Sequence, residues 1–561
     1  MSMKRKIIGS LLTGMLVLPG AVYAAQGAQT AEPVVKMSTA ESAAQGAEQK
    51  VYSLTFNPKS YTRQTLAYNG KAVAFRAYEH IPYVARPVAV ERQSMNIYIP
   101  EVYFQKGGTI NGYTAKTAPI FLPNGVGGYM PGDSKAPSEK DRMSGGANAS
   151  LVALSKGYVV AAPAIRGRTT QNKDGVYVGK APALIVDYKA AVRYLRHNRN
   201  LLPAGDTDKI ISNGTSAGGA LSVLLGATGN SKDYEPYLKA VGAAKERDDI
   251  FAASVYCPIT NLEHADMAYE WMFNGVNEAH QQTGRNLPAL PVQSTVTNRP
   301  ADAPVENQQA VKMTWDQQMA SLALKKQFPA YVNSLGLEDR KGNKLWLDAA
   351  GNGSFADYIK SVYLQSVQTA LDGGKDLDGA AWFRVKDGKA VDMDLAKYAA
   401  WATRLKATPA FDKFDLSSGE NDEFGDSANQ PKHFTAFSAL RDTGRGGSAD
   451  PAIIHLLNPM DYIGASGVKT SKYWRIRHGA KDRDTCLAIP AMVALKLQNE
   501  GKKVDFAAPW GYGHAGDYDL DALFTWMDRI WGCGQKPGHE NTIVKKNEIH
   551  QRANHCRADI V

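Results

Sequence analysis

The stretch Lys209–Ala227, KIISNGTSAGGALSVLLGA, constrains the fold of this chain more than any other segment. Its first residues are typical of the end of a short buried strand, and its last residues begin an apolar helix. Between them lies Gly-x-Ser-x-Gly at 214–218, with Ser216 at its centre. A serine on so sharp a turn is strained, and its neighbours two residues away must lack bulk. The flanking strand and helix favour a nucleophilic serine over the alternative, an ordinary loop of small residues.

Further apolar strand patterns lie on both sides of this motif, separated by helical patterns. The expected helices are a crossover helix with Leu184, Tyr188, Ala191, Val192 and Leu195 on one face, and a closing helix over Leu520–Trp531. This alternation predicts parallel βαβ units and an α/β sheet, with the first two strands antiparallel at its edge. Besides the motif strand, the expected strands are Ala72–Tyr78, Met95–Pro100, Pro119–Leu122, Gly157–Pro163, Phe251–Cys257, Tyr473–His478 and Lys503–Pro509.

The alternation stops near Pro258 and resumes at Tyr473. The intervening sequence has helix-like stretches at Gln309–Gln327 and Asp394–Lys406 and lacks runs of buried strand. We therefore expect a large, mainly helical lid at 259–455, inserted after the sixth strand. It would divide the core into a first part at 51–258 and a second part at 456–534.

The chain begins with the pattern of a secretory signal. Lys4, Arg5 and Lys6 precede a mostly apolar stretch from Ile7 to Leu18, and a cleavage pattern ends at Ala24. Residues 1–24 are thus expected to be a signal peptide. A disordered spacer is expected to follow at 25–50, because that segment is rich in Ala, Gln, Glu and Thr. The sequence predicts an exported protein, either periplasmic or secreted.

The four cysteines would lie in an oxidising compartment after export. Cys533 and Cys556 flank a polar C-terminal tail at 535–561 and could form a disulfide, whereas Cys257 ends a strand pattern and is expected to be a core thiol. No Cys/His spacing resembles a zinc site, and no metal or cofactor is expected.

The charge of the chain excludes one broad class of partner. The formal net charge of +10 would fall to +7 after loss of residues 4–6, and the remaining cations are scattered. Nucleic-acid binding is therefore not expected. No later apolar stretch reaches membrane-spanning length, so no membrane partner is expected either. These patterns leave the oligomeric state open and are compatible with a monomer.

A nucleophilic serine needs a base and an orienting acid, which follow it in the order Ser, acid, His in an α/β-hydrolase. Asp482 follows the Tyr473–His478 strand and is the expected acid, with Asp484 as its competitor. His514 lies in the loop before the closing helix, where the base belongs. The backbone N–H groups of Ala217 and of Gly127 or Gly128, in the glycine-rich loop after the Pro119 strand, would form the oxyanion hole.

Three segments of this chain resemble bacterial tannases, which belong to the α/β-hydrolase superfamily and cleave galloyl esters. They are GTSAGGALS at 214–222, PNGVGGYM at 123–130 and HGAKDRD at 478–484, and the resemblance extends over nearly the whole chain after residue 24. It implies a triad of Ser216, Asp482 and His514. It further implies that Lys406, Glu420 and Asp484 hold the hydroxyls of the galloyl ring. The charged residues Lys413, Asp415, Asp422 and Glu423 crowd the same stretch, which leaves the register of Lys406 and Glu420 open.

Several readings of function follow from these residues. The first is an exported serine esterase that hydrolyses galloyl esters of tannins and simple gallates through an acyl-enzyme. A feruloyl or chlorogenate esterase would share the triad but would not need three charged residues for ring hydroxyls. A secreted peptidase of this fold would usually carry a propeller repeat or an acidic pocket. A non-catalytic binding module would generally have lost a triad residue.

Overall fold

The computed structural model describes residues 50–141, 145–282, 308–377 and 379–532, and its central feature is one sheet of nine strands. The order is β1-β2-β3-β5-β4-β6-β7-β12-β13, antiparallel up to the β3–β5 pair and parallel from β5 onward. This arrangement confirms the predicted α/β-hydrolase fold. The strands are β1 Thr62–Tyr68, β2 Lys71–Pro82, β3 Ser94–Pro100, β4 Pro119–Pro123, β5 Val159–Pro163, β6 Asp206–Thr215, β7 Ala252–Tyr256, β12 Tyr473–Arg477 and β13 Lys503–Ala507.

The sheet edge differs from the expectation. β1 was not predicted, because its side chains alternate between exposed and only partly buried positions. The prediction that the next two strands form the edge is therefore wrong, and every residue of β3 is buried. A local signal was available, since Asn69 and Gly70 join β1 to β2 and both have positive φ. Asn-Gly between two strands is the preferred two-residue hairpin turn.

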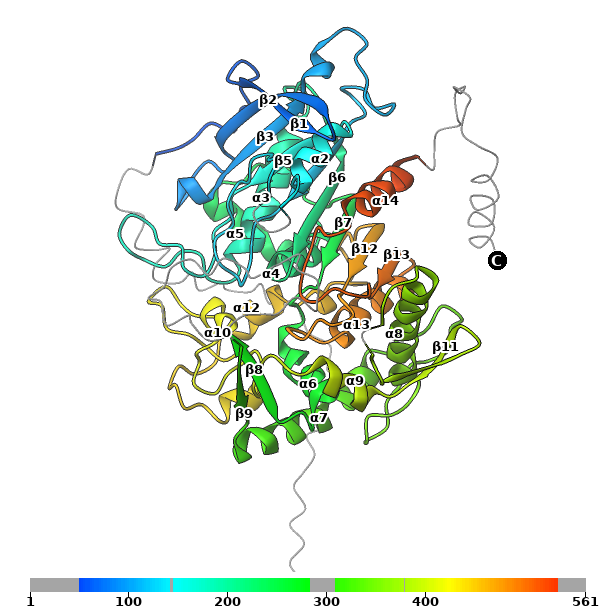
Figure 1. The fold of residues 1–561 in the computed structure, drawn as a ribbon. Coiled ribbons are helices and arrows are strands. Elements are labelled where there is room, and N and C mark those ends of the chain that lie inside the picture. Colours follow the sequence, from blue (N-terminus) through cyan, green and yellow to red (C-terminus); the bar gives the residue numbers. More distant parts are fainter. Residues whose placement is uncertain (1–49, 142–144, 283–307, 378, 533–561) are drawn as a thin grey trace, which may run out of the picture.

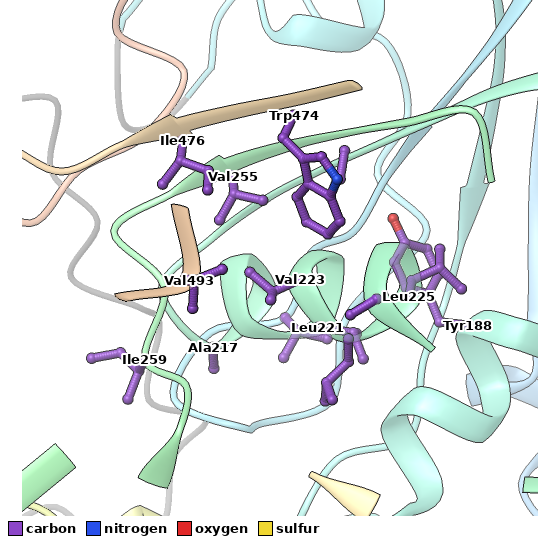
Figure 2. Close-up of a cluster of buried hydrophobic side chains, with 14 of the residues drawn as sticks. Tyr188, Ala217, Leu221, Val223, Leu225, Val255, Ile259, Trp474, Ile476 and Val493 are labelled. Carbon is purple, nitrogen blue, oxygen red and sulfur yellow. The ribbon is translucent and has the colours of Figure 1, made fainter. Parts of the chain in front are cut away.

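Helices cover both faces of the sheet. Helix α2 (Ala149–Ser155) packs against α14 (Leu520–Gly532), while α3 (Ala183–His197) packs against α4 (Ala217–Ala227), which also contacts β6 and β7. Figure 2 shows Val255, Trp474 and Ile476 reaching from their strands to α4, with Val493 of α13 (Ala488–Asn499) beside it. A Cβ at Gly226 would lie 2.5 Å from the Trp474 ring, so glycine is required for this close approach.

The segment between β7 and β12 forms a lobe below the sheet in Figure 1. Among its described residues are two short hairpins, which the sequence pattern did not reveal. The expected helix over Gln309–Gln327 begins instead at Trp315, after a capping box between Thr314 and Gln317. The helices are α6 Leu262–Phe273, α7 Trp315–Ser334, α8 Ser354–Asp372, α9 Leu395–Ala402, α10 Gly419–Glu423, α11 Ala436–Ala439 and α12 Pro451–Leu456, and the hairpins are β8 Glu278–Gln282 with β9 Gln308–Lys312 and β10 Phe383–Lys386 with β11 Lys389–Met393.

Several predicted features concern the chain ends. The signal peptide, the spacer before Lys50, the Cys533–Cys556 pair and the C-terminal tail lie outside the described residues. Cys257 is described, is free and is fully buried, which confirms the expected core thiol. Within the described ranges, no helix has the length and apolar character needed to cross a membrane.

Candidate active site

Ser216 lies between β6 and α4 on a turn that only small neighbours permit. Its backbone has φ 61° and ψ −124°, a strained conformation for a residue with a side chain. A Cβ at Gly214 would lie 2.2 Å from the Gly218 carbonyl oxygen, and a Cβ at Gly218 would lie 2.4 Å from Asn124 Oδ1. The two motif glycines are therefore required by contact, and the turn holds the serine at the carboxyl edge of the sheet.

The register of the parallel strands brings the predicted partners to the same edge. Thr215 pairs with Tyr256, Tyr256 with Arg477, and Arg477 with Ala507. The last residues of β6, β7, β12 and β13 are thus level with one another. The loops that follow these strands carry Ser216, Cys257, Asp482 and His514. Such an edge is where open α/β sheets bind ligands.

Ser216, His514 and Asp482 form a continuous hydrogen-bonded line. His514 Nε2 lies 2.8 Å from Ser216 Oγ, and His514 Nδ1 lies 2.9 Å from Asp482 Oδ2. The Asp482 side chain is fully buried, whereas the His514 side chain is 13% exposed. The three side chains are therefore within the distances that proton transfer requires, and Asp484 does not take the position of Asp482 beside His514 Nδ1.

The charged forms of Asp482 and His514 stabilise one another. Burial lowers the pKa of His514, but the negative charge of Asp482, with further contributions from Cys257 and Asp484, outweighs burial and raises that pKa well above its usual value. Burial raises the pKa of Asp482, but the neighbouring His514 and His478 lower it further, so it lies below its usual value. The site thus favours an ionised carboxylate beside an imidazole that accepts a proton readily.

His478 and Cys257, to which the sequence assigned no catalytic role, lie beside the side chains of Asp482 and His514. His478 is fully buried, and its Nδ1 is 3.5 Å from Asp482 Oδ2, while burial lowers the pKa of its imidazole. The ligating atoms of Cys257, Asp482 and His514 all lie within 4.8 Å of one another, a grouping that could hold a metal ion. An ion there would compete with the hydrogen bonds that His514 makes to Ser216 and Asp482. Strand pairing creates these contacts, and no motif in the sequence signals them.

The glycine-rich loop after β4 is fastened to the turn that carries Ser216. The Asn124 side-chain amide donates to the carbonyl oxygens of Asn213 (3.2 Å) and Gly218 (3.0 Å). Among the described residues, the N–H groups of Gly127, Gly128 and Ala217 have no hydrogen-bond acceptor. Free N–H groups beside a nucleophile are what an oxyanion hole requires.

Arg168, which the sequence did not single out, fixes the other side of this loop. Its Nε donates to the Gly128 carbonyl oxygen at 3.0 Å, and its guanidinium pairs with Asp422 of α10. One side chain therefore joins the glycine-rich loop to the helix that carries Glu420.

Lys406 and Asp484 meet beside the line of Ser216, His514 and Asp482. Lys406 Nζ lies 2.6 Å from Asp484 Oδ1, and both side chains are about one-fifth exposed, at 23% and 22%. Asp484 Oδ2 is 4.0 Å from His514 Nε2. Lys406 does not end a helix as expected, because α9 stops at Ala402 and Thr403 has a φ of 61°. It lies in the following loop, with its ammonium 4.2 Å from the Phe411 ring centroid.

The pKa values of this pair follow from its surroundings. Burial raises the pKa of Asp484, but the charges of Lys406 and His514 outweigh burial and lower it to about 2. Burial lowers the pKa of Lys406, yet Asp484 and then Glu420 raise it above its usual value. Glu420 thus acts on Lys406 through its charge, and among the described residues only Asp484 forms an ion pair with Lys406.

The other charged residues close to Lys406 and Glu420 in the sequence lie in different environments. Asp422 pairs with Arg168 and Lys180. Asp415 is exposed, and Glu423, the last residue of α10, is fully buried. Glu420 is the second residue of α10, whose N-cap Ser418 accepts a hydrogen bond from Asn421 N–H. Neither Asp415 nor Asp422 nor Glu423 forms an ion pair with Lys406.

Known proteins share both the fold and the sequence of this chain. The model of BD-FAE, an α/β-hydrolase family, matches residues 120–291. A tannase from Fusobacterium nucleatum is 49% identical, with a TM-score of 0.80, over 86% of this chain and 100% of its own. The tannin acyl hydrolase from Lactobacillus plantarum is 45% identical, with a TM-score of 0.77, over 85% of this chain and 98% of its own. A search of curated proteins found no match. The chain belongs to the tannases and is a carboxylic ester hydrolase.

Proposed function

We propose that this protein hydrolyses galloyl esters by a serine mechanism, with Ser216 as nucleophile, His514 as base and Asp482 as orienting acid. One observation supports both halves of the proposal. Asp484 binds Lys406 through Oδ1, and its Oδ2 is 4.0 Å from His514 Nε2, the atom that faces Ser216. Groups suited to phenolic hydroxyls are therefore next to the groups suited to ester cleavage.

In the first half of the reaction, Ser216 Oγ attacks the ester carbonyl carbon while His514 Nε2 accepts its proton. The backbone N–H groups of Ala217 and of Gly127 or Gly128 would bind the oxyanion, and each such donor contributes about 3 kcal/mol. When the intermediate collapses, the ester C–O bond breaks and His514 returns the proton to the leaving alcohol. Water then attacks the acyl-enzyme by the same route and releases the acid.

Ring recognition would rest on three charged residues, Lys406, Glu420 and Asp484. Phenolic hydroxyls donate hydrogen bonds to carboxylates, which suits Asp484 and Glu420, and the Lys406 ammonium can donate to a phenolic oxygen. A site with buried polar groups rejects analogues that leave those groups unpaired. A solved tannin acyl hydrolase bound to ethyl gallate, and another bound to 3,4-dihydroxybenzoate, are 45% and 44% identical to this chain. These relatives support a small phenolic substrate here.

Comparing methyl gallate with methyl ferulate tests the substrate class. We expect a higher kcat/KM for methyl gallate, and faster turnover of methyl ferulate would favour a feruloyl-type esterase instead. Lys406→Met should lower kcat/KM for methyl gallate by about 10- to 100-fold, because a hydrogen bond to a charged group is lost. Lys413→Met, which removes a partly buried lysine from the same loop region, is the matched control and should change it less than about twofold.

Export through residues 1–24 belongs to the same proposal and rests on the charged and apolar pattern of that segment. N-terminal sequencing of the protein recovered from the periplasm or medium should begin after Ala24. Recovery of the full-length chain in the cytoplasm would contradict export without affecting the esterase assignment.

A further inference from the structure

Lys406 and Asp484 come from segments that are far apart in the chain, so something must set the spacing between them. Their side chains meet at 2.6 Å, yet Lys406 lies in the loop after α9 and Asp484 in the turn after β12. Helix α6 lies between these segments and contacts α9 and α13. Tyr269, near the end of α6, is fully buried and reaches both segments.

The Tyr269 hydroxyl joins the two backbones directly. It accepts hydrogen bonds from the N–H groups of Leu405 (3.2 Å) and Lys406 (3.3 Å), and it donates to the Arg483 carbonyl oxygen at 2.8 Å. A phenolic hydroxyl has one proton to donate and two lone pairs that can accept, so these three bonds use its full capacity. Burial raises the pKa of Tyr269 to about 12, and the hydroxyl therefore keeps the proton that it donates.

The Tyr269 ring also supports the Lys406 side chain. It meets the Phe411 ring edge-on, with centroids 6.0 Å apart, and the Lys406 ammonium lies over the Phe411 ring, 4.2 Å from its centroid. The next residue of α6, Glu270, binds the buried Arg404 at 2.6 Å, and Arg404 Nε donates to the Lys406 carbonyl oxygen at 2.8 Å. Helix α6 thus holds Lys406 by its N–H group and by its carbonyl.

We infer that Tyr269 is a positioning residue that sets the distance between Lys406 and Asp484 and so the selectivity for the hydroxylated ring. The inference rests on the proposed role of those two residues. Within the described part of the chain, the Tyr269 hydroxyl bonds only to the backbone of Leu405, Lys406 and Arg483 and not to Ser216, His514 or Asp482, so the esterase chemistry itself should not depend on it. Groups that bind a ligand must be held to within about 0.5 Å by such supporting contacts.

The test compares two substrates in Tyr269→Phe. For methyl gallate we expect kcat/KM to fall about tenfold, mainly through KM, because losing the anchor loosens the pair that binds the ring. For 4-nitrophenyl acetate, which has no ring hydroxyls in its acyl group, kcat/KM should change less than about twofold. Tyr234→Phe is the matched control: Tyr234 is also fully buried, and its hydroxyl donates to the Leu456 carbonyl oxygen at 2.6 Å. This control should leave kcat/KM unchanged for both substrates.

A double-mutant cycle shows whether Tyr269 acts through Lys406. In a Lys406→Met background, Tyr269→Phe should lower kcat/KM for methyl gallate less than about twofold further. A full tenfold effect of Tyr269→Phe in the Lys406→Met background would overturn the inference. So would an unchanged kcat/KM of Tyr269→Phe for methyl gallate, or an equal loss of kcat/KM for both substrates. These outcomes are distinct from failure of the proposed function, in which wild-type protein would not hydrolyse methyl gallate.

A second variant covers the case in which Tyr269→Phe does not fold. The Arg483 guanidinium donates to Thr403 Oγ1, which is another tie between the same two segments. Thr403→Val removes this tie with little change in shape. A selective loss on methyl gallate would support the inference, whereas an equal loss on both substrates, or none, would overturn it.

Discussion

Asp482 and Asp484 lie in one short turn, and their side chains bind different partners. Asp482 Oδ2 accepts from His514 Nδ1 at 2.9 Å, while Asp484 Oδ1 pairs with Lys406 at 2.6 Å. The turn is stabilised internally, since Asp484 N–H donates to Asp482 Oδ1 at 2.9 Å. The position of the His514 imidazole and the position of the proposed ring-binding pair are therefore set by the same few residues.

Substituting Asp482 should change the pH dependence of activity as well as the rate. Because the charge of Asp482 raises the pKa of His514, Asp482→Asn should lower that pKa, and the acid limb of the kcat/KM profile should move to lower pH. The residual rate should be about 10⁴-fold below wild type, as in a serine protease with the same relay. Asp484→Asn should move the limb less, because Asp484 is 4.0 Å from the imidazole. An unmoved limb in Asp482→Asn would contradict the assignment of Asp482 as the orienting acid.

Acid should destabilise the wild-type protein partly through Asp484. Its pKa is about 2 in the folded protein and about 3.9 in an unfolded chain. A depressed carboxylate pKa adds stability above the unfolded value, and this stability is lost as the pH falls from about 4 toward 2. Between about pH 5.5 and pH 3, wild type should therefore lose about 1 kcal/mol more unfolding free energy than Asp484→Asn. Urea unfolding at both pH values measures this, and equal losses in the two proteins would contradict it.

Gly214→Ala should prevent formation of the turn that carries Ser216. The new methyl group would lie 2.2 Å from the Gly218 carbonyl oxygen and 2.5 Å from Asn124 Nδ2, and neither group can move without disturbing the turn. We expect loss of soluble protein or at least a 100-fold loss of kcat. Gly146→Ala is the control, because a Cβ there meets nothing within 4 Å. Normal activity in Gly214→Ala would show that the turn tolerates a side chain.

Arg168→Gln should slow the hydrolysis of all esters, whereas the effect of Lys406→Met is expected on galloyl esters. Arg168 holds the Gly128 carbonyl and also pairs with Asp422, so its loss frees the proposed oxyanion loop. We expect kcat to fall about tenfold for both methyl gallate and 4-nitrophenyl acetate. Arg199→Gln removes an ion pair in which the Arg199 side chain is 53% exposed and the Glu246 side chain 22%, and it should have little effect. An effect of Arg168→Gln confined to methyl gallate would instead indicate a role in ring binding.

Much of the site could be predicted because it depends on local patterns. The Ser216 turn needs glycines at fixed offsets, and the positions of Asp482 and His514 follow from the ends of β12 and β13. The structure brings these three side chains into hydrogen-bonding contact. The segments that carry them are each recognisable within about ten residues of sequence.

The remaining features depend on contacts between distant segments. His478 ends a predicted strand and carries no local sign of a role, yet folding places its Nδ1 3.5 Å from Asp482 Oδ2. Lys406 was expected on a helix end, but α9 stops earlier because Thr403 adopts a positive φ. Tyr269 looks like an ordinary core aromatic, and only the packing of α6 shows its hydroxyl between two loops. Such pairings are decided by tertiary structure, which no local pattern reports.

The most direct test of the central claim is the covalent intermediate on Ser216. Methyl gallate mixed with the enzyme, quenched in acid and digested, should yield the peptide that contains Ser216 with one galloyl group added. Ser216→Ala should give no such peptide and should lose at least about 10³-fold in kcat. A galloyl group on another residue, or full activity in Ser216→Ala, would contradict the account.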